Sequence, residues 1–198
     1  MDVLNAMNHE PFRRIVAILV ADGFEESEMT EPKRALDAAG VRTVIVTLKP
    51  GTVKAWSHDH YGDCYPVDTT VEESAVEDFD ALLLPGGVLS SDTLRASKAA
   101  VRFVRGFFRA GKPVAAICHG SQTMIDAGVV RNRTLTSFPS MRADLQNAGA
   151  NWVDAAVVID HGLVTSRSQG DLQHFTATVL AEFVEGRSPD YRAHAFWV

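Results

Sequence analysis

The stretch that decides the fold is KPVAAICHG, residues 112–120, in which an apolar run leads directly into a cysteine, a histidine and a glycine. Short apolar runs of this kind are typical of strands that are buried on both faces, as in a parallel sheet. A helix is expected from His119 to about Ala127, which places Cys118 on a tight turn between a buried strand and a helix. Such a turn exposes a nucleophile and points the next backbone N–H groups at a developing oxyanion. Because helix N-termini favour negative charge, we expect a lowered pKa for the Cys118 thiol.

Outward from this stretch, apolar strand-like runs alternate with helical patterns. The expected strands are 14–20, 41–48, 80–84, 113–117 and 134–137, with a hairpin of 157–159 and 163–165. The expected helices are 25–39, 97–110, 119–127, 141–148 and 172–184, and residues 50–70 read as irregular chain with short strands. Strands that alternate with helices predict an α/β fold: a three-layer sandwich with a mainly parallel, flavodoxin-like sheet and helices on both faces.

The length and composition suit one domain. The chain has 198 residues, and no apolar run approaches the roughly 18 residues that a membrane span needs. Residues 1–12 lack the basic start and apolar block of a signal peptide, which predicts a cytoplasmic protein. The net charge of −6 disfavours nucleic acid as a partner. We place the α/β domain at residues 13–185, an N-terminal extension at 1–12 and a C-terminal tail at 186–198, which we expect to pack on the domain or on a partner subunit.

Three loops are expected at the carboxyl edge of the sheet, where open α/β sheets bind ligands. They cover residues 21–28, 85–92 and 118–121. Glu25 and Glu28 are three residues apart at a helix start and share a face, so they could transfer protons beside the thiol or merely offset the helix dipole. Gly86 and Gly87 allow a close backbone approach and exposed N–H groups, although many strands end in Pro-Gly-Gly. Cys118 itself could be a small buried hydrophobe, but its place before His-Gly favours a nucleophile.

Two further groups of residues carry weaker signals. His58, Asp59 and His60 could be part of a metal site, but no third ligand stands at a convincing spacing, and an exposed loop is favoured. Cys64 lies in the same irregular region and is interpreted as structural. Two cysteines are too few for a disulfide framework. We therefore predict no metal and no cofactor.

Taken together, six segments make the chain similar to a known family: DGFEESE, FDALLLPGG, AICHG, GVVRNRTLTSFPS, LQNAGANWVD and VTSR. They resemble the PfpI family of intracellular cysteine proteases. This family lies within the superfamily of the Parkinsonism-associated deglycase and the class I glutamine amidotransferase-like domains. The segments spread from about residue 13 to residue 185, which is nearly the whole expected domain.

The resemblance implies roles for matching positions. Cys118 resembles the family nucleophile and His119 its neighbouring histidine, while Glu28, or alternatively Glu25, corresponds to the acid that hydrogen-bonds the thiol. Asp92 falls where protease-type members carry an acid that reaches the histidine of a neighbouring subunit. The oxyanion hole is expected from the N–H groups of Gly87 and His119, and the wider set of oxyanion or substrate contacts is Gly86, Gly87, Gly120 and Phe138. Members form dimers or hexamers and use no cofactor, so we expect at least a homodimer that shares Asp92 across its interface.

Three departures from the family pattern stand out. Phe138 takes a place where relatives often carry Tyr or Trp near the thiol, so no hydroxyl is available there. Asp92 is one methylene shorter than the Glu of some relatives. Residues 168–170, Ser-Gln-Gly, replace a stretch that commonly contains proline.

These residues support three hypotheses on function. The first is a peptidase-like cysteine hydrolase; its difficulty is that neighbours such as Cys118 and His119 diverge unless the turn bends sharply. The second is addition of the thiol to a small aldehyde or a glycated amine, as in a glyoxalase or deglycase, with Glu28 moving the proton. The third is a redox sensor or stress chaperone. Glutamine amidotransfer is disfavoured because no His-x-Glu occurs in the sequence.

Overall fold

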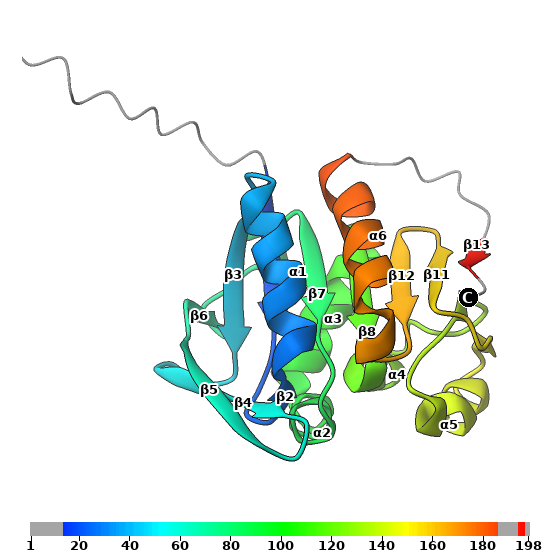
Figure 1. The fold of residues 1–198 in the computed structure, drawn as a ribbon, viewed down its shortest axis with the longest axis horizontal. Coiled ribbons are helices and arrows are strands. Elements are labelled where there is room, and N and C mark those ends of the chain that lie inside the picture. Colours follow the sequence, from blue (N-terminus) through cyan, green and yellow to red (C-terminus); the bar gives the residue numbers. More distant parts are fainter. Residues whose placement is uncertain (1–13, 186–193, 197–198) are drawn as a thin grey trace, which may run out of the picture.

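The computed structural model describes residues 14–185 and 194–196. Within this part of the chain, eight strands form the central sheet in the order β13-β11-β12-β8-β7-β1-β3-β6 (Figure 1). Their bounds are β1 (Ile15–Leu19), β3 (Arg42–Thr47), β6 (Thr69–Thr70), β7 (Ala81–Leu84), β8 (Val114–Ile117), β11 (Val157–Asp160), β12 (Leu163–Ser166) and β13 (His194–Phe196). All neighbouring pairs are parallel except those that β11 makes with β12 and β13. The expected mainly parallel sheet is confirmed.

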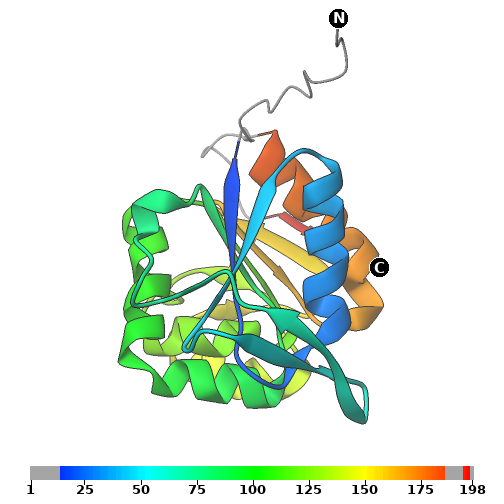
Figure 2. The same cartoon turned by 90° about the vertical axis from the view of Figure 1, so that its left-hand side faces the viewer.

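Helices cover both faces of this sheet (Figure 2). The helices are α1 (Glu26–Ala38), α2 (Val88–Ala96), α3 (Lys98–Arg109), α4 (Gln122–Asp126), α5 (Arg142–Asn147) and α6 (Leu172–Val184). Side chains alternate between the faces of a strand, and β1 shows the result. Ala17 and Leu19 pack in a core with α3 and α4, whereas Val16 and Ile18 pack in a second core with α1 and α6. The three-layer sandwich is therefore confirmed.

Two small sheets complete the fold. β4 (Thr52–Ser57) and β5 (His60–Pro66) form an antiparallel hairpin, and β2 (Phe24–Glu25) pairs with β4. The region expected to be irregular is thus an ordered hairpin, which lies near α1 and α2 at the lower edge of Figure 1. β9 (Thr134–Leu135) and β10 (Asn151–Trp152) form a second, two-stranded sheet.

The helix α2 was not expected. It begins directly after Gly87, whose φ of 96° belongs to the left-handed region that favours glycine. Its exposed residues include Val88 and Leu89, and its buried residues include Ser90 and Ser91, which is the reverse of the usual amphipathic pattern. Periodicity alone therefore gives no helix signal over these residues.

The described end of the chain contributes to the main sheet. β13 pairs antiparallel with β11 and places Ala195 opposite Val158. The expected packing of the rest of the tail, Tyr191 and Trp197 included, lies outside the described residues. Across the described residues, none of the helices combines the length and apolarity needed to span a membrane.

Candidate active site

The site is built around a sharp turn at the end of β8. Cys118 follows the last strand residue, Ile117, and opens a short 3₁₀ helix, η2 (Cys118–Ser121). Its φ of 60° lies in the left-handed region, which side chains other than glycine seldom adopt. Such strain is typical of functional turns. A Cβ at Gly120 would collide with the Leu84 carbonyl oxygen, so this glycine lets the turn pack against the end of β7.

Glu28 projects from the first turn of α1 onto the thiol. Its side chain is buried, accepts a hydrogen bond of 2.8 Å from the Gly86 N–H and forms another with Cys118. Burial raises the pKa of Glu28 to about 8, so the carboxyl group is mostly protonated at neutral pH. Gly86 makes this contact possible, because a Cβ there would collide with the Glu28 carboxyl group and lie 2.7 Å from the Cys118 Cβ.

The same surroundings determine the ionisation of the thiol. Burial is the largest effect and raises the pKa of Cys118, and a charged Glu28 raises this pKa further. The backbone N–H groups of His119 and Gly87 act in the opposite direction but are weaker. The expectation of a lowered thiol pKa, drawn from the helix N-terminus, is therefore wrong: desolvation and a like charge outweigh the N–H groups.

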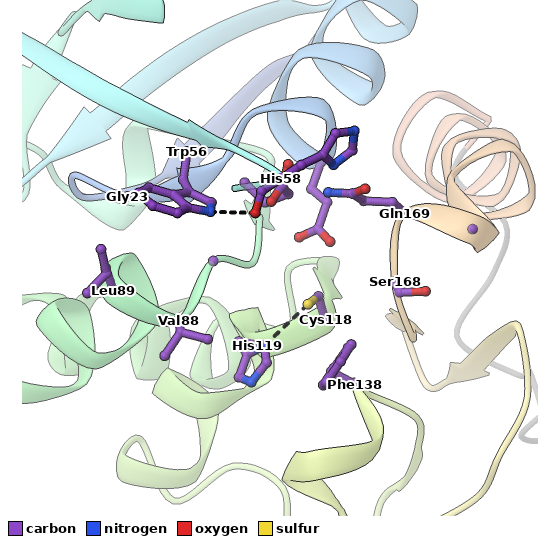
Figure 3. Close-up of a pocket in the computed structure, with 14 residues that line it drawn as sticks. Gly23, Trp56, His58, Val88, Leu89, Cys118, His119, Phe138, Ser168 and Gln169 are labelled. Atoms are coloured by element: carbon purple, nitrogen blue, oxygen red, sulfur yellow. Dashed lines mark hydrogen bonds between the residues drawn. The ribbon is translucent and has the colours of Figure 1, made fainter. Parts of the chain in front are cut away.

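His119 lies beside the thiol despite being its neighbour in sequence. Its Nδ1 is 3.3 Å from the Cys118 Sγ, because the left-handed turn brings the two side chains to one side (Figure 3). The imidazole stacks on the Phe138 ring, with 5.0 Å between centroids and 29° between planes. Burial lowers the pKa of His119, which keeps the ring neutral and able to accept a proton.

Gly87, which directly precedes α2, contacts the thiol through its backbone. Its backbone N–H donates a hydrogen bond to Cys118, as does that of His119. A Cβ on Gly87 would collide with the Gly23 carbonyl oxygen and approach the Glu25 nitrogen to 2.7 Å. Two N–H groups therefore converge on the reacting sulfur, where they favour the thiolate form.

These groups open into a cavity of about 720 Å³. Its lining residues are Gly23, Glu25, Glu28, Trp56, His58, Gly87, Val88, Leu89, Cys118, His119, Phe138, Ser168, Gln169 and Gly170. Figure 3 shows Val88 and Leu89 on one wall and His58 and Gln169 on the wall opposite Cys118. Among the described residues, the lining contains two carboxyl groups and no lysine or arginine. Its size suits a small organic molecule or one amino-acid side chain.

Residues 14–182 match the DJ-1/PfpI family. The chain belongs to the DJ-1/PfpI family. The Bacillus subtilis protein named "Putative cysteine protease YraA" is 42% identical over 165 residues, which make up 83% of this chain and 95% of the relative. A deglycase of Pyrococcus abyssi is 42% identical over 170 residues, or 86% of this chain and 97% of the relative.

Solved structures of DJ-1/PfpI members agree with this assignment. Drosophila melanogaster DJ-1beta superposes with a TM-score of 0.78 at 30% identity, covering 86% of this chain and 90% of that one. A two-domain Anabaena variabilis protein with DJ-1/ThiJ/PfpI-like and ferritin-like domains gives a TM-score of 0.81 at 35% identity, covering 86% of this chain and 48% of that one.

The structure of this DJ-1/PfpI member brings most of the expected site residues together. The cavity is lined by Cys118, His119, Glu28, Glu25, Gly87 and Phe138. Glu28 rather than Glu25 contacts the thiol. Glu25 accepts a hydrogen bond from the His58 backbone, and burial raises its pKa.

Three expected residues do not form the predicted contacts with an oxyanion or substrate within this chain. The Gly86 N–H is occupied by Glu28 and is not available to an oxyanion. Gly120 is buried against β7 and does not line the cavity. Both glycines therefore allow close packing of the site. Asp92 is exposed on α2 and lies outside the cavity wall of its own chain.

Sequence reasoning missed the contribution of the β4–β5 hairpin. Trp56 and His58 line the cavity, and the Trp56 indole donates a hydrogen bond of 2.8 Å to the His58 carbonyl oxygen. His58 has a φ of 57°, which identifies it as a turn residue.

The residues considered for a metal site do not form one. His60 contacts Asp59 at 2.8 Å on an exposed turn. Among the residues that the structure describes, no group of three or more His, Cys, Asp or Glu is placed to hold a metal ion.

Proposed function

We propose that this protein is a cysteine hydrolase that acts on peptides or related acyl groups. The observation that carries this proposal is the 3.3 Å distance between the His119 Nδ1 and the Cys118 Sγ. Because burial raises the pKa of the thiol, attack at neutral pH needs a base in contact with the sulfur. The neutral imidazole of His119 supplies that base. The name of the Bacillus subtilis relative supports the same chemistry.

The residues suggest a sequence of steps. His119 takes the thiol proton as the sulfur attacks the carbonyl carbon, and the N–H groups of His119 and Gly87 stabilise the oxyanion. The carbon–nitrogen bond then breaks, the leaving amine takes the proton from His119, and an acyl thioester remains on Cys118. Water hydrolyses the thioester and restores the thiol.

The lining of the cavity restricts the substrate. Glu25 and Glu28 contribute carboxyl groups, and Val88 and Leu89 contribute an exposed apolar wall. Because the described lining holds no lysine or arginine, an acidic group on the substrate would find no permanently charged partner and would face the carboxyl groups. We expect neutral, apolar or basic acyl groups to be accepted and acidic ones to be rejected.

Aldehyde chemistry is the second candidate, and Glu28 is the observation that favours it. A carboxyl group that contacts the sulfur and has a pKa of about 8 can donate and accept protons near neutral pH. The thiol would add to the aldehyde carbon of methylglyoxal as a hemithioacetal, and Glu28 would move the proton from C1 to C2. The resulting thioester would be hydrolysed to a hydroxy acid. The Pyrococcus abyssi relative is named a deglycase, which supports this candidate.

Assembly and location belong to the same proposal. We propose a cytoplasmic homodimer, or a hexamer built from such dimers, in which Asp92 of one subunit approaches His119 of the other. The exposed position of Asp92 on α2 is compatible with this arrangement. Mixing Asp92→Ala with Cys118→Ala subunits should restore activity if the site is shared, because one hybrid site would carry both intact groups.

A substrate panel tests the two candidate reactions. We expect wild-type protein to release a fluorophore from peptide amides, Cys118→Ala to be inactive, and Glu28→Gln to retain most of this activity. The second measurement is the consumption of methylglyoxal by the same three proteins. If methylglyoxal is consumed, peptides are not cleaved and Glu28→Gln is inactive, the protein is an aldehyde-processing enzyme instead.

A further inference from the structure

The outer nitrogen of His119 has a partner within its own chain. The His119 Nε2 lies 3.3 Å from the Ser140 Oγ, on the side of the ring away from Cys118. We propose that Ser140 is a positioning residue for the cysteine–histidine pair: its hydroxyl oxygen accepts the Nε2–H and leaves the Nδ1 that faces the thiol unprotonated. This inference rests on the proposed hydrolase function, and it gives His119 an acceptor within its own chain in addition to the Asp92 carboxylate proposed to approach from a neighbouring subunit.

The loop that carries Ser140 is tied to the nucleophile turn. The Phe138 N–H donates a hydrogen bond of 3.3 Å to the Cys118 carbonyl oxygen, and Phe138 stacks on the His119 ring. The Met141 N–H bonds to the Phe138 carbonyl oxygen at 2.9 Å and closes the short helix η3 (Pro139–Met141), while the Met141 side chain is buried in the core. One short segment therefore fixes both the plane of the imidazole, through Phe138, and its outer nitrogen, through Ser140.

The chemistry of a hydroxyl group fits this role. A neutral imidazole carries its proton on either nitrogen, and an acceptor at Nε2 selects the form with a free Nδ1. Ser140 is exposed, so its own O–H can point to solvent while its oxygen accepts. A hydroxyl group carries no charge and does not favour the imidazolium, in keeping with a lowered His119 pKa. A carboxylate in that position would raise this pKa instead.

Four variants test the inference. Ser140→Ala removes the acceptor, Ser140→Thr restores it, and Ser140→Asp replaces it with a charge. Thr178→Ala is the matched control, because it removes a hydroxyl group on α6 that donates a hydrogen bond to the His174 carbonyl oxygen of the same helix. The other titratable groups that line the cavity are Cys118, Glu25, Glu28 and His58, and all of them stay unchanged in this series.

The first readout is the activity on the best peptide amide. We expect Ser140→Ala to lower kcat about fivefold with KM unchanged, as for the loss of one hydrogen bond, and Ser140→Thr to recover most of it. Ser140→Asp should move the acid limb of the pH profile to higher pH, because a carboxylate beside Nε2 favours the charged imidazole. Thr178→Ala should match wild type in both measurements.

The second readout does not depend on any substrate. Nitrogen NMR of ¹⁵N-histidine-labelled protein reports which ring nitrogen of His119 carries the proton. We expect the Nε2–H form in wild type and Ser140→Thr, and a mixture of the two forms in Ser140→Ala. An unchanged His119 signal in Ser140→Ala overturns the inference, as does an unmoved acid limb in Ser140→Asp. If peptides are not cleaved but the NMR result holds, the hydrolase proposal fails and the positioning role of Ser140 stands.

Discussion

The ionisations of Glu28 and Cys118 oppose each other. Both side chains are largely buried, they share a hydrogen bond, and burial raises the pKa of each. Ionisation of one group therefore opposes ionisation of the other, and the pair titrates as a unit. Gly86 permits the contact, since a Cβ there would collide with the Glu28 carboxyl group and lie 2.7 Å from the Cys118 Cβ.

This competition predicts how the thiol reacts. We expect alkylation of Cys118 by iodoacetamide to accelerate steadily from pH 6 to pH 9, with no plateau below neutral pH, because the raised pKa keeps the thiol protonated. In Glu28→Gln the curve should shift to lower pH, since the neutral amide cannot repel the thiolate. Peptide mapping separates Cys118 from the exposed Cys64. Glu31→Gln, an exposed change on the same helix, is the control, and a shift to higher pH in Glu28→Gln would contradict the argument.

The buried carboxyl group also makes stability depend on pH. The pKa of Glu28 rises from 4.5 to about 8 on folding, so the folded state binds a proton that the unfolded state has already lost. The stabilisation from this proton is complete below about pH 4.5 and disappears as the pH rises to about 8, with an upper limit of about 5 kcal/mol. Glu25, whose pKa is also raised, contributes in the same direction.

Urea unfolding at pH 5, 6, 7 and 8 measures this effect. The free energy of unfolding should fall with rising pH in wild type and fall less steeply in Glu28→Gln, whose side chain cannot titrate. A parallel decline in both proteins would show that Glu28 is already ionised in the folded state at pH 5.

At the scale of elements, the β4–β5 hairpin is held to α1 by one carboxylate. The Glu26 Oε1 accepts hydrogen bonds from the Asp63 N–H at 2.9 Å and from the Tyr65 hydroxyl at 2.8 Å. The same hairpin places Trp56, the cross-strand partner of Tyr61, and the turn residue His58 in the cavity wall. The position of this wall therefore depends on a side chain that does not itself line the cavity.

Removing that contact should affect binding more than chemistry. We expect Glu26→Ala to raise KM severalfold with little change in kcat, because Cys118 and His119 lie on other elements. Tyr65→Phe keeps the hydrogen bond from the Asp63 N–H to Glu26 and should raise KM less. Hydrogen exchange of the amides in residues 52–66 should accelerate in Glu26→Ala. A fall in kcat at constant KM, with these amides still protected, would show that the hairpin is not held by Glu26.

The elements differ in how far the sequence predicts them. The apolar runs of β1, β7 and β8 specify buried strands, and α6 lies where its pattern places it, at Leu172–Val184. The nucleophile turn follows from the same reasoning, because the end of a buried strand is fixed once the strand is known. In contrast, α2 lacks an amphipathic pattern, and β5 is almost entirely exposed, so neither carries a hydrophobic signal.

The candidate site shows the same division. Glu28, His119 and Gly87 follow local rules of spacing or resemble a family pattern. Long-range packing decides three other features of the site: the direction in which the pKa of Cys118 is shifted, the contact of His119 with Ser140, and the position of His58 in the cavity wall. Such contacts join residues that no local pattern relates to each other.

At the scale of the whole molecule, the last described strand protects the edge of the sheet. β13 pairs with β11 along Val157, Val158 and Ile159. Without it, β11 would present unpaired N–H and C=O groups, and open edges of this kind promote association between chains.

Truncation tests this role. Deleting residues 194–198 should lower the thermal unfolding temperature and cause aggregation that depends on protein concentration. A chain that ends at Phe196 keeps the strand and is the matched control. Alkylation of Cys118 should be unchanged in both proteins, because the cavity lining includes no residue of β11 or β13. Equal melting temperatures and equal solubility would show that β11 tolerates an open edge.

The place of β13 also bears on how the protein is best produced. An affinity tag fused after Val198 would begin only two residues beyond a strand that must pair with β11. We expect a bulky or charged tag there to compete with this pairing. A tag placed before residue 1 is fourteen residues away from β1, which is an inner strand of the sheet between β7 and β3.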